Sequence, residues 1–306
     1  MAVYNYNVLD KVVLLGGHTD NTLTASVLSR VNVCSLALDV SRMADGNNAG
    51  MSFDKVLKVD FLCRLCYFGS SRVTELIFYL GSGSQLIGRS DVCNYPSEAA
   101  LLPVAGKFAD PHVERILSLK PTLIVTNDLI NPNIKTTFEK CNIKTSMLQC
   151  RNIAEYRKCV EILSRILNAG EKGRKEIERI DNFLKNPPPP LNIKVLWVIW
   201  DSPLMVAGKN SLPDEVIRLA GAENIAANVP QPYFKCSYDW LLEQDIDVIV
   251  WSASPNGWKN RSFWQKMTAV KANRIIHDLN PDLIQRPGPR IFEGIMLVRQ
   301  TLEKMR

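Results

Sequence analysis

From residue 72 onward, the apolar residues follow two spacings, one typical of helices and one typical of short buried strands. In residues 72–80 they recur every three or four positions, which predicts an amphipathic helix with Gly81 and Gly83 closing its C-terminus. Residues 123–125 and 248–251 are continuously apolar and too short for helices, so they predict buried strands at 123–125 and 247–251. Helices that alternate with such strands are typical of parallel α/β layers.

The same spacings predict the other elements. We expect strands at 86–88, 143–148, 193–200 and 274–279, and helices at 131–141, 152–168, 171–185, 212–220 and 289–305. Asp110 and Pro111 predict a helix start, with the acid as N-cap and the proline in the first turn. The four prolines at 187–190 cannot continue a helix, so they mark a boundary.

The pattern of the first half returns in the second half at an offset of 125 residues. Glu114 then corresponds to Asp239, and the pairs that follow are Leu117 with Leu242, Leu123 with Val248, Ile124 with Ile249 and Val125 with Val250. We therefore expect two α/β lobes of ordinary domain size. The predicted boundaries are an irregular N-terminal extension (1–58), an N-terminal lobe (59–150), a helical linker ending in the proline run (151–190) and a C-terminal lobe (191–306).

Composition agrees with a globular protein and excludes several classes. The chain has 306 residues, 46% hydrophobic and 22% charged, with a net charge of +6. The basic residues of 171–185 alternate with acids, which indicates a solvated helix face rather than a nucleic-acid site. No apolar run approaches the ~20 residues of a membrane span. The apolar run at 12–15 is too short for a secretory signal, so we expect no signal peptide.

Candidate catalytic and metal chemistry is sparse. The eight cysteines are scattered, and Cys63 and Cys66 form a lone CxxC that favours buried strand thiols over a zinc site. The three histidines, His18, His112 and His277, contain no pair at metal-ligand spacing, although His112 could ligate a chelated metal or haem. The chain lacks GxSxG, HExxH and P-loop motifs, so we expect no catalytic activity and no catalytic cofactor.

Six segments resemble a known family. They read TELIFYLGSG (74–83), SDVCNYP (90–96), FADPHVERILSLKP (108–121), AGAENIA (220–226), SYDWLL (237–242) and RPGPR (286–290). In this order they are similar to motifs of the iron-chelate and vitamin B12 substrate-binding proteins of ABC importers. The resemblance runs from about residue 61 to the C-terminus, and residues 1–55 match nothing in it.

The resemblance implies a fold and a function. The fold would be two Rossmann-like α/β lobes joined by a single long helix within 171–185, with the ligand in a cleft between the lobes. The chain would be a monomeric, extracytoplasmic protein, periplasmic or membrane-anchored, that binds cobalamin or another metal chelate and delivers it to the permease subunits of an ABC transporter. Three alternatives remain open: a ferric siderophore or haem binder, a chelate carrier that is not exported, and an enzyme of a related α/β fold.

The resemblance also implies ligand-binding residues. Tyr95, Phe108 and Tyr233 fall where cobalamin-binding members place cleft aromatics, and aromatic faces suit a flat macrocycle. Asp282 matches an acid near the ligand, or is a turn residue after Pro281. Each aromatic has the simpler alternative of an ordinary core or loop side chain.

Two further predictions concern strand ends and docking. Trp200 and Asp201 end a predicted central strand, where ligand sites of α/β proteins usually lie. Glu114 and Asp239 match the carboxylates, one on each lobe, that dock to permease arginines, although acids near helix starts are also favourable by themselves. Arg290 is expected to orient the last helix. Arg72, Arg89 and Arg286 leave a siderophore ligand open.

Overall fold

The computed structural model describes residues 4–8, 11–15, 65–68, 71–108, 110–126 and 131–306. The chain divides into two compact units, Met1–Cys63 and Arg64–Arg306. In the first unit, β1 (Tyr4–Val8) and β2 (Lys11–Leu15) pair as an antiparallel hairpin, so the described part of this segment is regular where we expected an irregular extension. Cys63 and His18 lie outside the described residues.

The N-terminal lobe is built on a parallel sheet. Its strands are β3 (Leu65–Phe68), β4 (Leu86–Gly88), β7 (Leu123–Thr126) and β8 (Lys144–Met147), in the order β4-β3-β7-β8. The helices are α2 (Ser71–Tyr79), α3 (Val113–Ser118) and α4 (Pro132–Lys140), and two short turns are η2 (Gly83–Gln85) and η3 (Ser97–Leu101). Ile116, Ile124 and Phe138 are fully buried where α3 and α4 meet β7.

The predicted helix start at Asp110 and Pro111 is wrong. These residues form β6 (Asp110–Pro111), which pairs with β5 (Gly106–Lys107) in an antiparallel ladder. The His112 amide continues this pairing by donating to the Ala105 carbonyl at 2.9 Å. The chain therefore stays extended until His112, which takes the N-cap position of α3 without a side-chain hydrogen bond.

Two packed helices follow β8. They are α5 (Ile153–Ile166) and α6 (Gly170–Lys185), and α6 is the long helix that precedes the proline run. Asn152 caps α5 by accepting from the Glu155 amide. Gly173 allows a close approach, because a Cβ there would lie 2.3 Å from Cβ of Ser164. The Tyr156 hydroxyl donates to the buried Glu176 carboxylate at 2.6 Å, which joins the two helices.

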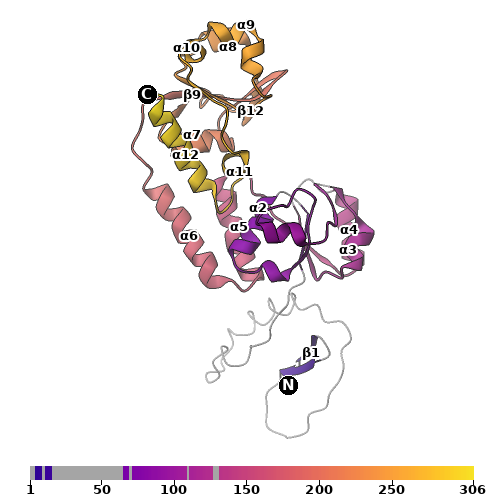
Figure 1. The fold of residues 1–306 in the computed structure, drawn as a ribbon. Helices are drawn as coiled ribbons and strands as arrows, with labels where there is room; N and C mark the ends of the chain where they lie inside the picture. Colours follow the sequence, from indigo (N-terminus) through magenta and orange to yellow (C-terminus); the bar gives the residue numbers. More distant parts are fainter. Residues whose placement is uncertain (1–3, 9–10, 16–64, 69–70, 109, 127–130) are drawn as a thin grey trace. The chain divides into compact units, whose positions relative to one another are not determined.

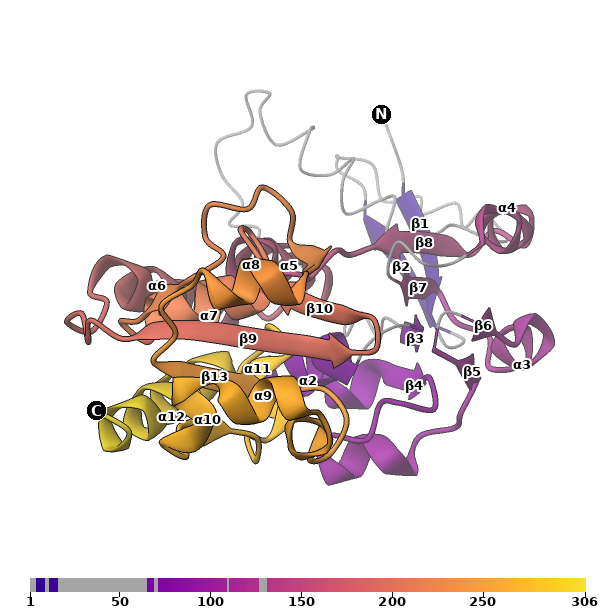
Figure 2. The same cartoon turned by 90° about the horizontal axis from the view of Figure 1, so that it is seen from above.

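The C-terminal lobe is a mixed sheet with helices on both faces. Its strands are β9 (Lys194–Asp201), β10 (Leu204–Ala207), β11 (Glu223–Asn224), β12 (Tyr233–Lys235), β13 (Val248–Trp251) and β14 (Ile275–Ile276). The order is β12-β10-β9-β13-β14, with β11 also paired to β9. Strand β10 is antiparallel to both of its neighbours, β9 and β12, whereas β11 and β13 pair parallel with β9 and β14 pairs parallel with β13. Seen from above, β9 and β10 form one long hairpin (Figure 2).

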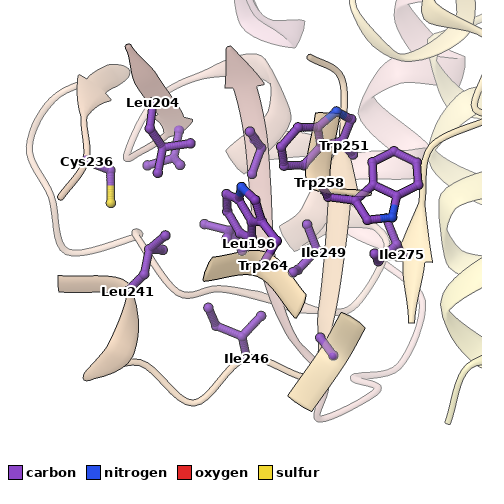
Figure 3. Close-up of a cluster of buried hydrophobic side chains, with 13 residues drawn as sticks. Leu196, Leu204, Cys236, Leu241, Ile246, Ile249, Trp251, Trp258, Trp264 and Ile275 are labelled. Atoms are coloured by element: carbon purple, nitrogen blue, oxygen red, sulfur yellow. The ribbon is translucent and has the colours of Figure 1, made fainter. Parts of the chain in front are cut away.

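The two faces of this sheet have different helical cover (Figure 1). On one side lie α7 (Leu212–Leu219) and α12 (Ile291–Lys304), with the short α11 (Pro281–Ile284) before α12. On the other lie α8 (Tyr238–Leu242), α9 (Ser262–Lys266) and α10 (Thr268–Lys271), together with η4 (Gly257–Asn260). The second side holds a cluster of 13 buried residues, including Trp251, Trp258 and Trp264 (Figure 3).

The internal repeat is confirmed by the placement of elements. β7 and β13 begin at Leu123 and Val248 and end at Thr126 and Trp251, so their bounds differ by 125 residues at both ends. The helix before each strand begins at the same offset. Both lobes also close an earlier helix with a left-handed glycine, Gly81 (φ 80°) after α2 and Gly221 (φ 88°) after α7, a conformation that favours glycine.

Candidate functional site

Four of the predicted ligand-binding residues are aromatic side chains that remain largely exposed. The exposed fractions are 43% for Tyr95, 42% for Phe108, 56% for Trp200 and 45% for Tyr233. Tyr95 and Phe108 lie in the connections around η3 and β5, whereas Trp200 and Tyr233 lie on strands of the C-terminal lobe. None of the four is an ordinary core aromatic.

Tyr233 lines a small pocket in the C-terminal lobe. The pocket has a volume of about 230 Å³ and is lined by Ile199, Leu212, Pro213, Tyr233, Ser252 and Gln285. Burial raises the pKa of the Tyr233 hydroxyl, while the charge of Arg72 and a hydrogen bond with the Leu212 backbone act in the opposite direction. Arg72 belongs to α2 of the N-terminal lobe, so the electrostatic environment of Tyr233 includes both lobes.

The RPGPR segment (286–290) joins the two lobes. Arg286 donates to the Ser71 hydroxyl at the start of α2 and pairs with Asp282 at 3.0 Å. Arg290 donates two hydrogen bonds, of 2.7 and 2.9 Å, to the Glu75 carboxylate of α2. The guanidinium of Arg290 also covers the ring of Tyr95, 3.7 Å from its centroid. This segment therefore brings Tyr95 and Asp282 toward one region, while Gln285, which precedes it, borders the Tyr233 pocket.

The remaining predicted residues are held by contacts within their own lobes. The Phe108 amide donates to Asp91 Oδ1 at 3.0 Å. The Trp200 indole N–H donates to the Ser202 carbonyl at 2.8 Å. Asp201 ends β9 as expected, and its carboxylate accepts a hydrogen bond from the Ser254 hydroxyl. That contact gives Asp201 a role in ordering the loop after β13.

The three candidate arginines differ in their surroundings. Arg89 donates to four backbone carbonyls, those of Ser90, Asp91, Ala100 and Leu102, so its guanidinium organises the loop between β4 and β5. Arg72 donates to the Cys150 carbonyl, and its Nε is buried without a hydrogen-bond partner. Arg72 and Arg286 both lie where α2 faces the C-terminal lobe.

The two predicted docking acids occupy equivalent places. Glu114 is the second residue of α3 and Asp239 the second residue of α8, and both are exposed. Each also lies in the first turn of its helix, where a negative charge is favourable. The structure thus presents one accessible carboxylate on each lobe at the same point of the repeat.

In the part of the chain that the structure describes, no group of three or more His, Cys, Asp or Glu side chains could hold a metal ion. His112 is exposed at the N-cap of α3. Among the same residues, no helix has both the length and the apolar character needed to cross a membrane.

Comparison with known proteins identifies the family. A profile of the periplasmic binding protein family matches residues 68–281, which is more than half of the chain. This chain belongs to the periplasmic binding protein family. As the six motifs predicted, the chain is a substrate-binding component of an ABC importer.

Curated relatives have related names. The vitamin B12-binding protein of Vibrio parahaemolyticus is 26% identical over 246 residues, which cover 76% of this chain and 87% of the relative. The protein of the same name from Pectobacterium carotovorum is 28% identical over 250 residues, with 76% and 88% covered.

Solved structures share the two-lobed fold. The periplasmic vitamin B12 binding protein BtuF of Vibrio cholerae superposes with a TM-score of 0.63 at 24% identity, covering 79% of this chain and 97% of its own. The periplasmic heme binding protein HutB of Vibrio cholerae superposes with a TM-score of 0.67 at 19% identity, covering 78% and 98%. The predicted fold class, two α/β lobes with a single long helix between them, is confirmed.

The structure adds one residue that the sequence reasoning missed. Glu75 lies within the TELIFYLGSG motif but received no role, and its side chain is only 12% exposed. It is the one acidic residue of α2, where the helix is otherwise mostly apolar and buried. A lone carboxylate among apolar helix positions was the available signal that it has a partner.

Proposed function

We propose that this chain captures a cobalamin-like metal chelate between its lobes, delivers it to an ABC permease and catalyses no reaction. The names of its relatives support a corrinoid as the first candidate. The family supports an extracytoplasmic site of action, and we propose that the protein works there as a monomer. The bound metal would be part of the cargo and not a cofactor of the chain.

The observation behind this proposal is the exposure of four large aromatic side chains, three of them at positions that the family resemblance implies and the fourth, Trp200, at the predicted strand end. Large apolar groups left in water are a feature of binding surfaces, and aromatic rings offer much contact area at a low cost in side-chain entropy. The pocket beside Tyr233, about 230 Å³, is smaller than the roughly 300–1,000 Å³ typical of small-molecule sites. It can therefore admit only part of a macrocycle, and the rest must pack on exposed rings.

A haem ligand is the second candidate, for a specific reason. Arg72 and Arg286 place two positive charges near the Tyr233 pocket and the RPGPR segment, and Arg72 Nε lacks a partner. Guanidinium groups bind carboxylates well, and haem presents two carboxylates whereas a corrin ring mainly presents amides. The solved structure of the heme binding protein HutB has the same fold, so the fold is compatible with both ligands.

A titration with three probes tests the proposal. Cyanocobalamin, hemin and a ferric siderophore would each be added to the full chain, with tryptophan fluorescence and the visible spectrum recorded. We expect saturable quenching with at least one probe, and cyanocobalamin to bind most tightly. Tyr233→Ala should weaken that binding roughly tenfold, while Ile162→Ala, at an exposed site on α5, should leave it unchanged. No response to any probe would contradict the proposal.

Glu114 and Asp239 are proposed as the permease-docking carboxylates. Their equivalent, exposed positions support this, because charges at an interface rim govern orientation and association rate. Glu114→Lys and Asp239→Lys should abolish ligand uptake by vesicles containing the permease, with unchanged ligand affinity. Glu139→Lys, an exposed acid on α4, is the matched control. Full uptake with both docking variants would reject this assignment.

A further inference from the structure

Arg290 and Glu75 form a largely buried ion pair across the two lobes. Arg290 precedes α12, and Glu75 lies 215 residues earlier in α2. The Nε and one terminal nitrogen of Arg290 donate to the two carboxylate oxygens at 2.7 and 2.9 Å. The side chains are only 21% and 12% exposed. Two parallel hydrogen bonds fix the plane of the guanidinium as well as its position.

The fixed guanidinium covers one predicted ligand-binding aromatic. Its central carbon lies 3.7 Å from the centroid of the Tyr95 ring, which is van der Waals contact. The attraction between a cation and the face of an aromatic ring favours this arrangement. The Tyr95 side chain is nevertheless 43% exposed, so the rest of the ring remains accessible.

This contact has a consequence for binding. Tyr95 lies in an irregular loop, between β4 and η3, and an unsupported ring there would lose rotational freedom when a ligand packs against it. A ring already held by Arg290 has lost that freedom before the ligand arrives. Because Glu75 and Arg290 come from different lobes, the orientation of the ring also depends on the arrangement of both lobes.

We infer that Glu75 and Arg290 are positioning residues for the ligand, which hold Tyr95 in its binding orientation. The inference rests on the proposed function, since it presumes that the ligand contacts Tyr95. It differs from a role in lobe cohesion alone, because a cohesive ion pair would affect affinity whether or not Tyr95 is present.

A double-mutant cycle separates these two roles. Arg290→Lys keeps the charge but removes the planar, two-bond contact, and Tyr95→Leu removes the ring. With cyanocobalamin and hemin as probes, we expect Arg290→Lys to weaken binding roughly fivefold and Tyr95→Leu roughly tenfold. The double variant should bind within about twofold of Tyr95→Leu. Losses that multiply would show that Arg290 does not act through Tyr95, and would overturn the inference.

Matched variants control for folding and for general loss of an ion pair. Arg157→Lys alters a similar two-bond pair, between Arg157 and Asp181 at 2.8 and 2.9 Å, and should leave affinity unchanged. Glu75→Gln provides a second route to loosening Arg290 if Arg290→Lys folds poorly. We expect it to weaken binding only when Tyr95 is present.

A measurement without ligand keeps the inference distinguishable from the proposed function. The chain would be labelled with 3-fluorotyrosine, and the Tyr95 signal identified by its loss in Tyr95→Phe. Arg290→Lys should shift and sharpen that ¹⁹F resonance as the ring gains mobility, whereas Arg157→Lys should not. An unchanged resonance would overturn the inference even if the probes bind. A changed resonance in a chain that binds no probe would reject the proposed function and leave only the ring-ordering contact.

Discussion

The two lobes repeat one unit but complete it differently. In both, a short helix with an exposed acid precedes a fully buried parallel strand, β7 or β13. The N-terminal lobe surrounds that unit with a purely parallel four-stranded sheet, whereas the C-terminal lobe adds β10 and β12, and β10 pairs antiparallel with both β9 and β12. The shared unit therefore accounts for the similarity of the two lobes, and the added strands account for the difference between their sheets.

The difference extends to the site and to the cores. Trp200 and Tyr233 lie on strands of the C-terminal lobe, but Tyr95 and Phe108 lie in N-terminal connections. Trp264 makes edge-on contacts with Trp251 and Phe263, at 5.1 and 5.5 Å between ring centroids. The C-terminal lobe therefore carries its two exposed aromatics on strands over a core rich in aromatic contacts, whereas the N-terminal lobe carries its two in irregular connections.

The largest expected effect is a loss of stability when a ring is removed from the core of either lobe. Trp264→Ala and Phe138→Ala each remove a fully buried ring, which costs about 3–5 kcal/mol. Trp264→Ala should lie at the upper end because it also loses aromatic contacts, each worth about 0.5–1.5 kcal/mol. Denaturant unfolding measures both, with the exposed Trp200→Ala as control, expected within about 0.5 kcal/mol of wild type. Equal losses at Trp264 and Phe138 would show that the aromatic contacts of Trp264 add nothing to the stability of its core.

The next effect concerns the helix between the lobes. Glu176 of α6 is buried, accepts from Tyr156 of α5 and pairs with Arg179, which also donates to the Pro289 carbonyl. Removing one partner of a buried pair is strongly destabilising, so Glu176→Ala should lower the free energy of unfolding by about 3 kcal/mol. Glu178→Ala on the same helix breaks only the exposed pair with Arg174 and should cost under about 0.5 kcal/mol. Similar losses for both variants would be incompatible with this role.

The loss of ligand affinity on removing one aromatic from each lobe compares the lobes directly. Tyr233→Ala should weaken cyanocobalamin binding by roughly tenfold, and Phe108→Ala by only about threefold, because Phe108 lies on a less supported connection. Fluorescence titration measures both dissociation constants. A larger loss for Phe108→Ala would reverse the ranking of the two lobes.

The smallest expected effect is on the pH dependence of stability, where two glutamates should act in opposite directions. Hydrogen bonds from Arg151 lower the pKa of Glu155, whereas burial raises the pKa of Glu215. Ionised Glu155 therefore stabilises the fold fully at pH values above its pKa in the unfolded chain, about 4.3. This stabilisation is lost as the pH falls through the pKa of Glu155 in the folded protein. In the folded protein the protonated form of Glu215 is favoured. Its contribution to the free energy of unfolding is therefore fully present below about pH 4.3 and is lost as the pH rises through its pKa in the folded protein.

Glutamine variants measure these two dependences. Relative to wild type, Glu155→Gln should lose stability as pH rises from 3 to 7, because the wild type gains from its carboxylate. Glu215→Gln should gain relative stability over the same range, because its neutral amide avoids the cost of a buried charge. Denaturant unfolding at several pH values tests both. Parallel trends in the two variants would refute the opposite signs.

Much of the fold was predictable from local pattern. The repeat at 125 residues, the buried strands β7 and β13 and the glycine caps follow from periodicity and from φ requirements that only neighbouring residues decide. Asp110 and Pro111 misled the prediction because a helix-start signature is also compatible with a short extended ladder. The pairing of β6 with β5, a contact with another segment, decided between the two.

The sequence by itself determined the alternating helices and strands and the 125-residue repeat, because these follow from the spacing of apolar residues, and its resemblance to a known family indicated the aromatic and acidic positions. Tertiary structure alone decided which of those positions meet. Glu75 and Arg290 are 215 residues apart, and nothing local to either predicts that they share two hydrogen bonds over Tyr95. Such contacts depend on how the two lobes pack together, and local periodicity contains no information about that packing.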